Sequence, residues 1–148
     1  MSQTNELEIM ERIALDLERV EESLASSFNT GAEDFNALIR PLSAAGGKRL
    51  RAQLCLLIAN AGTSIERQRI KIAEAVEMLH LATLIHDDVL DQAEIRRGED
   101  TIHMHKGNKV AILSGDYLFA KAFKIVSEMT NMKYLQVFSH IITCLVEG

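Results

Sequence analysis

Three aspartates, Asp87, Asp88 and Asp91, are the residues of this sequence with the clearest potential for chemistry. The apolar spacing from Leu79 onward predicts a helix that reaches Asp91, which places Asp87 and Asp91 one turn apart on one face, about 6 Å along the axis. Two carboxylates so close repel each other unless a cation lies between them. Their oxygens suit Mg²⁺, which takes one or two protein carboxylates and completes its octahedron with water and phosphate oxygens. The spacing therefore predicts a Mg²⁺ site that faces a phosphorylated ligand, although a solvated acidic helix end has the same pattern.

Two basic segments could bind the phosphates of such a ligand. Arg96 and Arg97 follow the aspartates and present planar forks that match phosphate oxygens. Residues 46–51 read Gly-Gly-Lys-Arg-Leu-Arg and place a flexible turn before a predicted helix, whose free backbone amides and dipole favour an anion. Lys48 and Arg51 are three residues apart and can face one phosphate together. An ordinary solvated basic turn explains this second segment equally well on its own.

Two histidines lie close to the aspartates along the predicted helix. His80 precedes Asp87 by seven residues, or two turns, and can face the same cavity as the basic turn, although such a histidine is more often an ordinary core residue. His86 is turned by about 100° from Asp87, so we do not expect it to be a ligand. Glu77-x-x-His80 matches half of a di-iron signature, which needs a second copy that the sequence lacks. The pair His86-Asp87 also fits a metal phosphohydrolase, but that alternative leaves both basic segments unexplained.

The elements that must position these residues are helices. Apolar residues recur every three or four positions in the first part of the chain: Leu7, Met10, Ile13, Leu17, Val20, Leu24 and Phe28. Similar spacing predicts helices over residues 35–42, where Pro41 should kink or divide the helix, over 48–61, from Ser64 into the aspartates, and over 110–129 and 134–147. Residues 92–100 are predicted to form a loop, and no alternating strand pattern is visible. These patterns predict an all-α fold.

The overall composition narrows the class of protein. With 148 residues, of which 47% are hydrophobic, the chain can build one sizeable helical core or a large part of a bigger domain. A net charge of -5 argues against a nucleic-acid-binding protein. Cys55 and Cys144 lie far apart in apolar helical contexts, which favours free thiols in a reduced, cytoplasmic setting. Neither a secretory signal nor an apolar run of about 20 residues is visible, so no transmembrane segment is expected.

The motifs, taken in order, resemble those of the trans-isoprenyl (polyprenyl) diphosphate synthases. The likeness rests on residues 46–51, on His80 with segment 87–91 (Asp-Asp-Val-Leu-Asp) and on Arg96-Arg97-Gly98, and residues 107–108 (Gly-Asn) and 115–118 (Gly-Asp-Tyr-Leu) extend it. It implies an antiparallel helical bundle of the isoprenoid synthase type around a deep central cavity. Residues 1–148 would be the first half of a single such domain, since the first aspartate-rich motif is present and the second is absent. We therefore expect a truncated chain that is inactive on its own.

This resemblance implies a Mg²⁺-dependent prenyltransferase that condenses isopentenyl diphosphate with an allylic prenyl diphosphate. By the same resemblance, Asp87 and Asp91 would bind Mg²⁺ and, together with Arg96, be the catalytic residues, while Asp88 would support them. Arg96 would bind the allylic diphosphate. The residues implied for isopentenyl diphosphate are Lys48, Arg51, His80 and Arg97.

Side chains just before the aspartates bear on product length in this family. Ala82 and Thr83 are small, and Leu79 lies further along the expected wall, which implies room for a long-chain trans-polyprenyl product such as a menaquinone side-chain precursor. Small residues that only permit close helix packing explain the same pattern. The motifs are most similar to those of the catalytic, larger component of bacterial heptaprenyl-type synthases, which implies a dimer or a heterodimer with a small regulatory subunit. A non-catalytic regulatory subunit and a metal-dependent phosphohydrolase stay open as alternatives.

Overall fold

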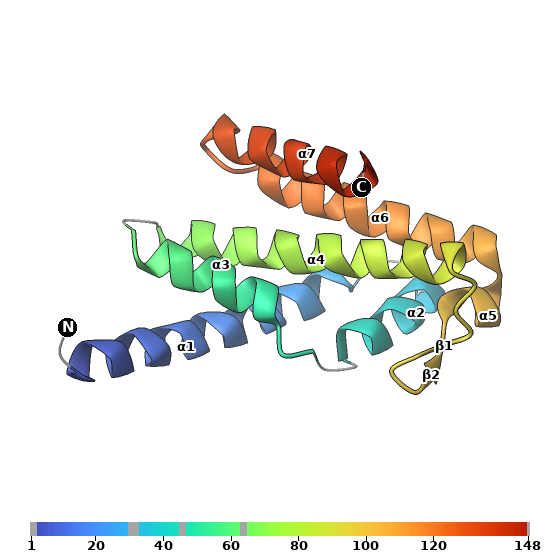
Figure 1. Ribbon diagram of the computed structural model, residues 1–148, viewed down its shortest axis with the longest axis horizontal. Helices are drawn as coiled ribbons and strands as arrows, with labels where there is room; N and C mark the ends of the chain where they lie inside the picture. The colour runs from blue at the N-terminus through green and yellow to red at the C-terminus, as the bar shows by residue number, and fades with distance from the viewer. Residues whose placement is uncertain (1–2, 30–32, 45–46, 63–64, 148) are drawn as a thin grey trace.

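The computed structural model describes residues 3–29, 33–44, 47–62 and 65–147 (Figure 1). Its helices over these residues are α1 (Gln3–Ser27), α2 (Glu33–Ala44), α3 (Leu50–Asn60), α4 (Glu66–Leu90), α5 (Ile102–Lys106), α6 (Asn108–Ser127) and α7 (Met132–Glu147). Two short strands, β1 (Ile95–Arg96) and β2 (Glu99–Asp100), pair antiparallel. The all-α prediction is confirmed, whereas Gly46 and Ser64 lie outside the described residues.

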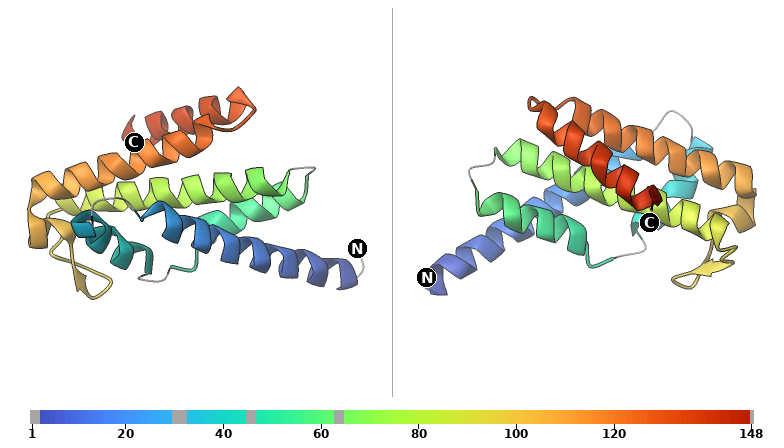
Figure 2. Two further views of the ribbon diagram at one scale, coloured as in Figure 1. Left: turned by 180° about the vertical axis from the view of Figure 1, so that it is seen from behind. Right: turned by 45° about the horizontal axis from the view of Figure 1, so that its top comes forward.

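The long helices form an antiparallel bundle around α4. Figure 1 shows α1, α4 and α7 running in one direction and α3 and α6 in the other, and the left view of Figure 2 shows the same arrangement from behind. The most extensive helix contact is that of α4 with α6. Both helices bury small side chains, among them Ala75, Ala82, Ala111 and Ala122, which suits close packing. α4 is therefore the central wall of the bundle, and its last turn carries the aspartates.

Much of the predicted apolar stripe of α1 is buried. Its buried members are Ile13, Val20, Leu24 and Phe28, whereas Leu7 near the start of the helix is exposed. Cys55 on α3 and Cys144 on α7 are both free thiols, as predicted. None of the helices in the described ranges combines the length and the hydropathy of a membrane span.

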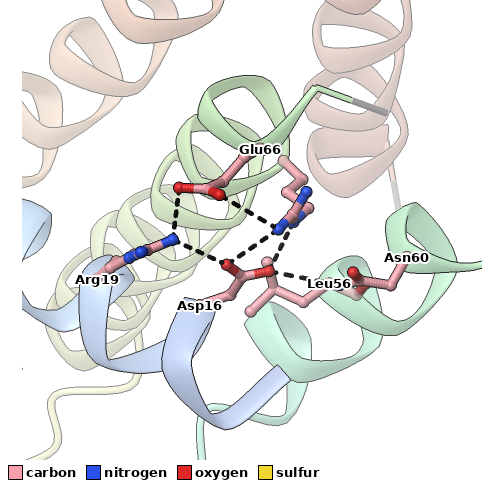
Figure 3. Close-up of polar contacts among 6 residues, drawn as sticks. Asp16, Arg19, Leu56, Asn60 and Glu66 are labelled. Carbon is pink, nitrogen blue, oxygen red and sulfur yellow. Dashed lines mark hydrogen bonds and ion pairs between the residues drawn. The ribbon is translucent and has the colours of Figure 1, made fainter. Parts of the chain in front are cut away.

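A buried carboxylate ties α1 to α3 and α4 (Figure 3). The side chain of Asp16 on α1 is 1% exposed, and Arg69 on α4 donates to both of its oxygens over 2.6 and 3.2 Å. Asn60 on α3 donates to the same carboxylate over 3.4 Å, and Arg19 pairs with both Asp16 and Glu66. Because a buried charge is tolerated only when it is paired and hydrogen-bonded, these contacts fix the relative positions of the three helices.

A second buried carboxylate, that of Glu74 on α4, strengthens the contact with α1. It has no exposed surface and accepts hydrogen bonds from Ser23 over 2.7 Å, from Ser27 over 2.6 Å and from Lys71 over 2.7 Å. Both serines belong to α1. The long first helix is thus held to the central wall by hydrogen-bonded charges as well as by apolar contacts.

Three short elements differ from the sequence predictions. β1 and β2 form a tight hairpin inside the predicted loop, with Arg97 at φ 55° and Gly98 at φ 87° in its turn. Left-handed residues of this kind match the twist of two paired strands. α5 spans five residues, too few to show an apolar period in the sequence. α2 continues through Pro41 to Ala44, so the proline does not divide that helix.

Candidate functional site

Asp87 and Asp91 lie at the exposed C-terminal end of α4. Asp91 caps the helix, and its N–H donates to the carbonyl of Asp87 over 2.8 Å. Among the described residues, neither carboxylate belongs to an ion pair. Both stand at the negative end of the helix dipole, where an acidic group is disfavoured by some tenths of a kcal/mol. Two such oxygen donors one turn apart form a set that Mg²⁺ accepts, so their chemistry fits the predicted metal.

Asp88 has a different environment from its two neighbours. It is 5% exposed, and the Nε of Arg96 in β1 donates to its Oδ1 over 2.6 Å. The side chain implied for the allylic diphosphate is therefore held against the end of α4. Asp88 follows the buried Ile85 by three residues and so shares its inward face. That spacing is the sequence signal for a structural role, whereas the resemblance implies only that Asp88 supports the metal site.

The structure brings together all four residues implied for isopentenyl diphosphate. A cavity of about 200 Å³ is lined by Gly47, Lys48, Arg49, Leu50, Arg51, Glu77, His80, Leu81, Leu84 and Arg97. Arg97 comes from the hairpin, and its guanidinium lies over Gly47, where an added Cβ would be 3.5 Å from a terminal nitrogen of Arg97. Lys48 comes from the turn before α3, Arg51 from the first turn of α3, and His80 from α4. We call this space the basic cavity.

The charges around the basic cavity act on His80. Burial lowers the pKa of His80, and the positive charges of Arg51, Arg97 and Arg96 lower it further, against an opposing effect of Glu77. At the imidazole, the charges of the arginines therefore outweigh that of Glu77. A cavity with this excess of positive charge is suited to a diphosphate.

The basic cavity and the aspartates lie along one helix. His80 and Asp87 are seven residues apart, which is about 10 Å along α4. An anion in the cavity and a metal at the aspartates would therefore be neighbours without sharing their main ligands. This arrangement can hold two phosphorylated groups side by side.

The residues predicted to set product length differ in exposure. Ala82 has no exposed surface, Leu79 is 4% exposed, and Thr83 is half-buried with its hydroxyl donating to the carbonyl of His80 over 2.8 Å. An apolar groove of about 430 Å³ lies further back, between α4 and α7, and is lined by Ile72, Val76, Asn131, Lys133, Tyr134, Val137, Phe138 and Ile141. The role of Ala82, Thr83 and Leu79 in product length stays a prediction.

Two residues that line the basic cavity are not predicted from the sequence to do so. Arg49 and Glu77 line the basic cavity, yet both are buried, at 8% and 3% exposure. Glu77 had attracted notice only as part of a Glu-x-x-His pattern. Its position one helical turn before His80 is the sequence signal that it lies near the basic cavity.

His86 turns away from the aspartates, as predicted. Its Nε2 lies 3.1 Å from the carbonyl oxygen of Ile112 and 3.4 Å from a carboxylate oxygen of Asp116, both on α6. Its ring also stacks at a tilt on Phe119, with centroids 5.5 Å apart. The side chain therefore joins α4 to α6.

An all-α antiparallel bundle, with aspartates at the end of its central helix and a basic cavity beside that helix, is the architecture of an isoprenoid synthase, and the comparisons agree. The polyprenyl synthetase family model matches residues 32–148. Octaprenyl diphosphate synthase of Escherichia coli is 32% identical over 140 residues, covering 95% of this chain and 43% of that protein. This chain belongs to the polyprenyl synthetase family.

Solved structures show the same relationship. Heptaprenyl diphosphate synthase from Staphylococcus aureus matches with a TM-score of 0.85 at 29% identity, over 92% of this chain and 43% of that one. Polyprenyl synthase from Caulobacter crescentus, solved with calcium and isoprenyl diphosphate, matches with a TM-score of 0.88 at 35% identity, over 95% of this chain and 43% of that one. The chain thus spans less than half the length of these relatives.

Proposed function

We propose that this chain supplies the diphosphate-binding wall of a trans-polyprenyl diphosphate synthase, which condenses isopentenyl diphosphate with an allylic prenyl diphosphate. The observation that carries the proposal is the convergence of Lys48, Arg51, His80 and Arg97 on one cavity. Asp87 lies two turns further along the same helix. A two-substrate condensation needs two adjacent diphosphate sites, whereas a phosphohydrolase needs one.

Different residues bind the two substrates. Lys48, Arg51 and their partners bind isopentenyl diphosphate and aim its double bond at the allylic carbon, which gains rate through orientation. Arg96, held by Asp88, binds the allylic diphosphate. Asp87 and Asp91 would hold Mg²⁺, which when bound supplies positive charge that stabilises the departing diphosphate. The new carbon–carbon bond forms as the allylic carbon–oxygen bond breaks, and loss of a proton restores a double bond.

The product and the setting are part of the same proposal. Small side chains at Ala82 and Thr83 favour a long product, in line with the octaprenyl and heptaprenyl names of two relatives. Such a product would serve as a quinone side-chain precursor, as in menaquinone. We place the enzyme in the cytoplasm, as a dimer or as the larger subunit of a heterodimer, with this chain as the part of the domain that bears the first aspartate-rich motif.

A chimera tests the activity. Residues 1–148 are joined to the part of E. coli octaprenyl diphosphate synthase that this chain does not match, and the fusion is incubated with Mg²⁺, farnesyl diphosphate and radiolabelled isopentenyl diphosphate. We expect label in long prenyl chains and its loss in the Asp87→Asn fusion. The unmatched E. coli part alone is the control.

Two outcomes would contradict the proposal. Release of free phosphate without chain extension would favour a phosphohydrolase. A folded fusion without turnover, combined with stimulation of an intact synthase by the 148-residue chain, would favour a regulatory subunit.

A further inference from the structure

Glu77 lies behind the basic cavity and connects two other elements. It belongs to α4, and its carboxylate is almost fully buried, at 3% exposure. Oε1 accepts the backbone N–H of Ala52 over 3.0 Å, and Oε2 lies 3.6 Å from a terminal nitrogen of Arg49. Ala52 is the third residue of α3, whose first amides have no partner within the helix. Glu77 therefore caps α3 from a neighbouring helix.

Arg49 has an unusual backbone that needs support. It precedes α3 with φ 45° and ψ 39°, in the left-handed region, which disfavours residues with a Cβ by about 1–2 kcal/mol. Its guanidinium points inward and donates to both oxygens of Glu21 on α1, over 2.5 and 3.1 Å. Burial lowers the pKa of Arg49, but the hydrogen bonds and charges of Glu21 and Glu77 outweigh it, and the net pKa is raised. The two carboxylates thus hold this turn of the chain.

The flanking residues are those of the anion site. Lys48 precedes Arg49 directly, and Arg51 follows it by two residues. Lys48 and Arg51 line the same cavity as His80 and Arg97, while the guanidinium of Arg49 is held by Glu21 and Glu77. A change in the backbone at Arg49 would move both cations.

We propose that Glu77 is a positioning residue for diphosphate binding. By holding Arg49 and the first turn of α3, it places Lys48 and Arg51 in the cavity that His80 also lines. The inference rests on the proposed function, because it concerns the site assigned there to isopentenyl diphosphate.

Electrostatics and positioning predict opposite effects for Glu77. A carboxylate that lines the cavity repels an anion, so charge alone predicts that Glu77→Gln tightens diphosphate binding. Positioning predicts weaker binding, because the amide keeps the size of the side chain but loses the charge that holds Arg49. Whether Glu77→Gln strengthens or weakens diphosphate binding therefore distinguishes charge repulsion from positioning.

The test measures binding of inorganic pyrophosphate to the 148-residue chain by calorimetry in buffer with EDTA, where the aspartates have no metal through which to bind it. We expect Glu77→Gln to raise the dissociation constant about tenfold. The matched control is Glu74→Gln, a buried carboxylate three residues earlier that is held by Ser23, Ser27 and Lys71 away from the cavity. We expect Glu74→Gln to lower the unfolding temperature and to leave binding unchanged.

Each outcome bears on the proposal. Equal or tighter binding by Glu77→Gln overturns positioning and leaves the proposed function standing. No binding by the unaltered chain overturns the diphosphate site and the positioning role together. If Glu77→Gln does not fold, Glu21→Gln replaces it, because this second partner of Arg49 is 45% exposed. Pyrophosphate binding by the Glu21→Gln chain should weaken about threefold, and unchanged binding would overturn the proposal.

Discussion

The three aspartates at the end of α4 lie in different surroundings. Asp87 and Asp91 are exposed and without ion-pair partners among the described residues, whereas Asp88 is 5% exposed and binds Arg96. A helix turns by about 100° per residue, which sends adjacent side chains into different surroundings. The aspartate motif therefore combines two exposed carboxylates, which we propose to bind metal, with a structural anchor for the hairpin.

The first prediction separates these two roles by stability. Asp87→Asn removes a charge at the unfavourable end of the helix dipole, so we expect a gain of a few tenths of a kcal/mol in unfolding free energy without metal. Asp88→Asn leaves the Arg96 guanidinium without its anion, and we expect a loss of about 1–3 kcal/mol. Urea denaturation in EDTA measures both. A larger loss for Asp87→Asn than for Asp88→Asn would show that the assignment is wrong.

The second prediction concerns the pH dependence that His80 confers. Burial and then the nearby arginines lower its folded pKa below the ordinary value of 6.5. Between the two values the unfolded chain binds more protons than the folded one, so stability from His80 is present above pH 6.5 and is lost as pH falls through the folded pKa. We expect His80→Gln to lose less unfolding free energy on acidification than the unaltered chain. Parallel pH profiles of the two chains would contradict this.

At the scale of elements, α4 and α6 approach closely at Gly115. A Cβ at that position would lie 2.3 Å from Nε2 and 2.5 Å from Cδ2 of His86. The absence of a side chain lets the imidazole reach the carbonyl of Ile112 on α6. Gly115 is therefore part of the helix contact that supports the aspartate-bearing turn.

The third prediction is that Gly115→Ala destabilises the protein. Alanine in place of glycine inside a helix normally raises the unfolding free energy by about 1 kcal/mol. Here the methyl group displaces His86 from its contacts, and we expect a net loss of about 1–2 kcal/mol. Thermal unfolding measures the effect. In a His86→Ala background the same change should be neutral or stabilising, and an equal loss in both backgrounds would exclude the clash as its cause.

Sequence patterns predict where the helices lie, but they predict poorly which side chains of different helices contact each other. The spacing of Val20, Leu24 and Phe28 correctly placed the buried face of α1, because helix periodicity is a local property. The partners of Arg49 lie 28 residues away in each direction, at Glu21 and Glu77, and no local spacing shows them. Which basic side chain of a turn points inward depends on such distant partners. The resemblance identified the cavity residues, and the structure was needed to show what holds them.

At the scale of the whole molecule, α1 belongs to the fold although it precedes the matched family region. The family model begins at residue 32, whereas α1 spans Gln3–Ser27. From α1 come Asp16 and Glu21, the ion-pair partners of the largely buried Arg69 and Arg49, and both serine partners of Glu74. The basic cavity therefore depends, through Arg49, on a helix that precedes the residues matched by the family model.

The fourth prediction is that residues 32–148 alone lose cooperative unfolding. Truncation exposes the surface against which Val20, Leu24 and Phe28 pack, each worth about 2 kcal/mol of burial, and it strips Arg69 and Glu74 of their partners on α1. Together these losses are comparable to the whole stability of a small domain. Urea titrations followed by circular dichroism should show a broad transition, and a synthetic peptide of residues 1–31 should restore a sharp one. A truncated chain that unfolds as sharply as the full chain would mean that the other helices fold cooperatively without α1.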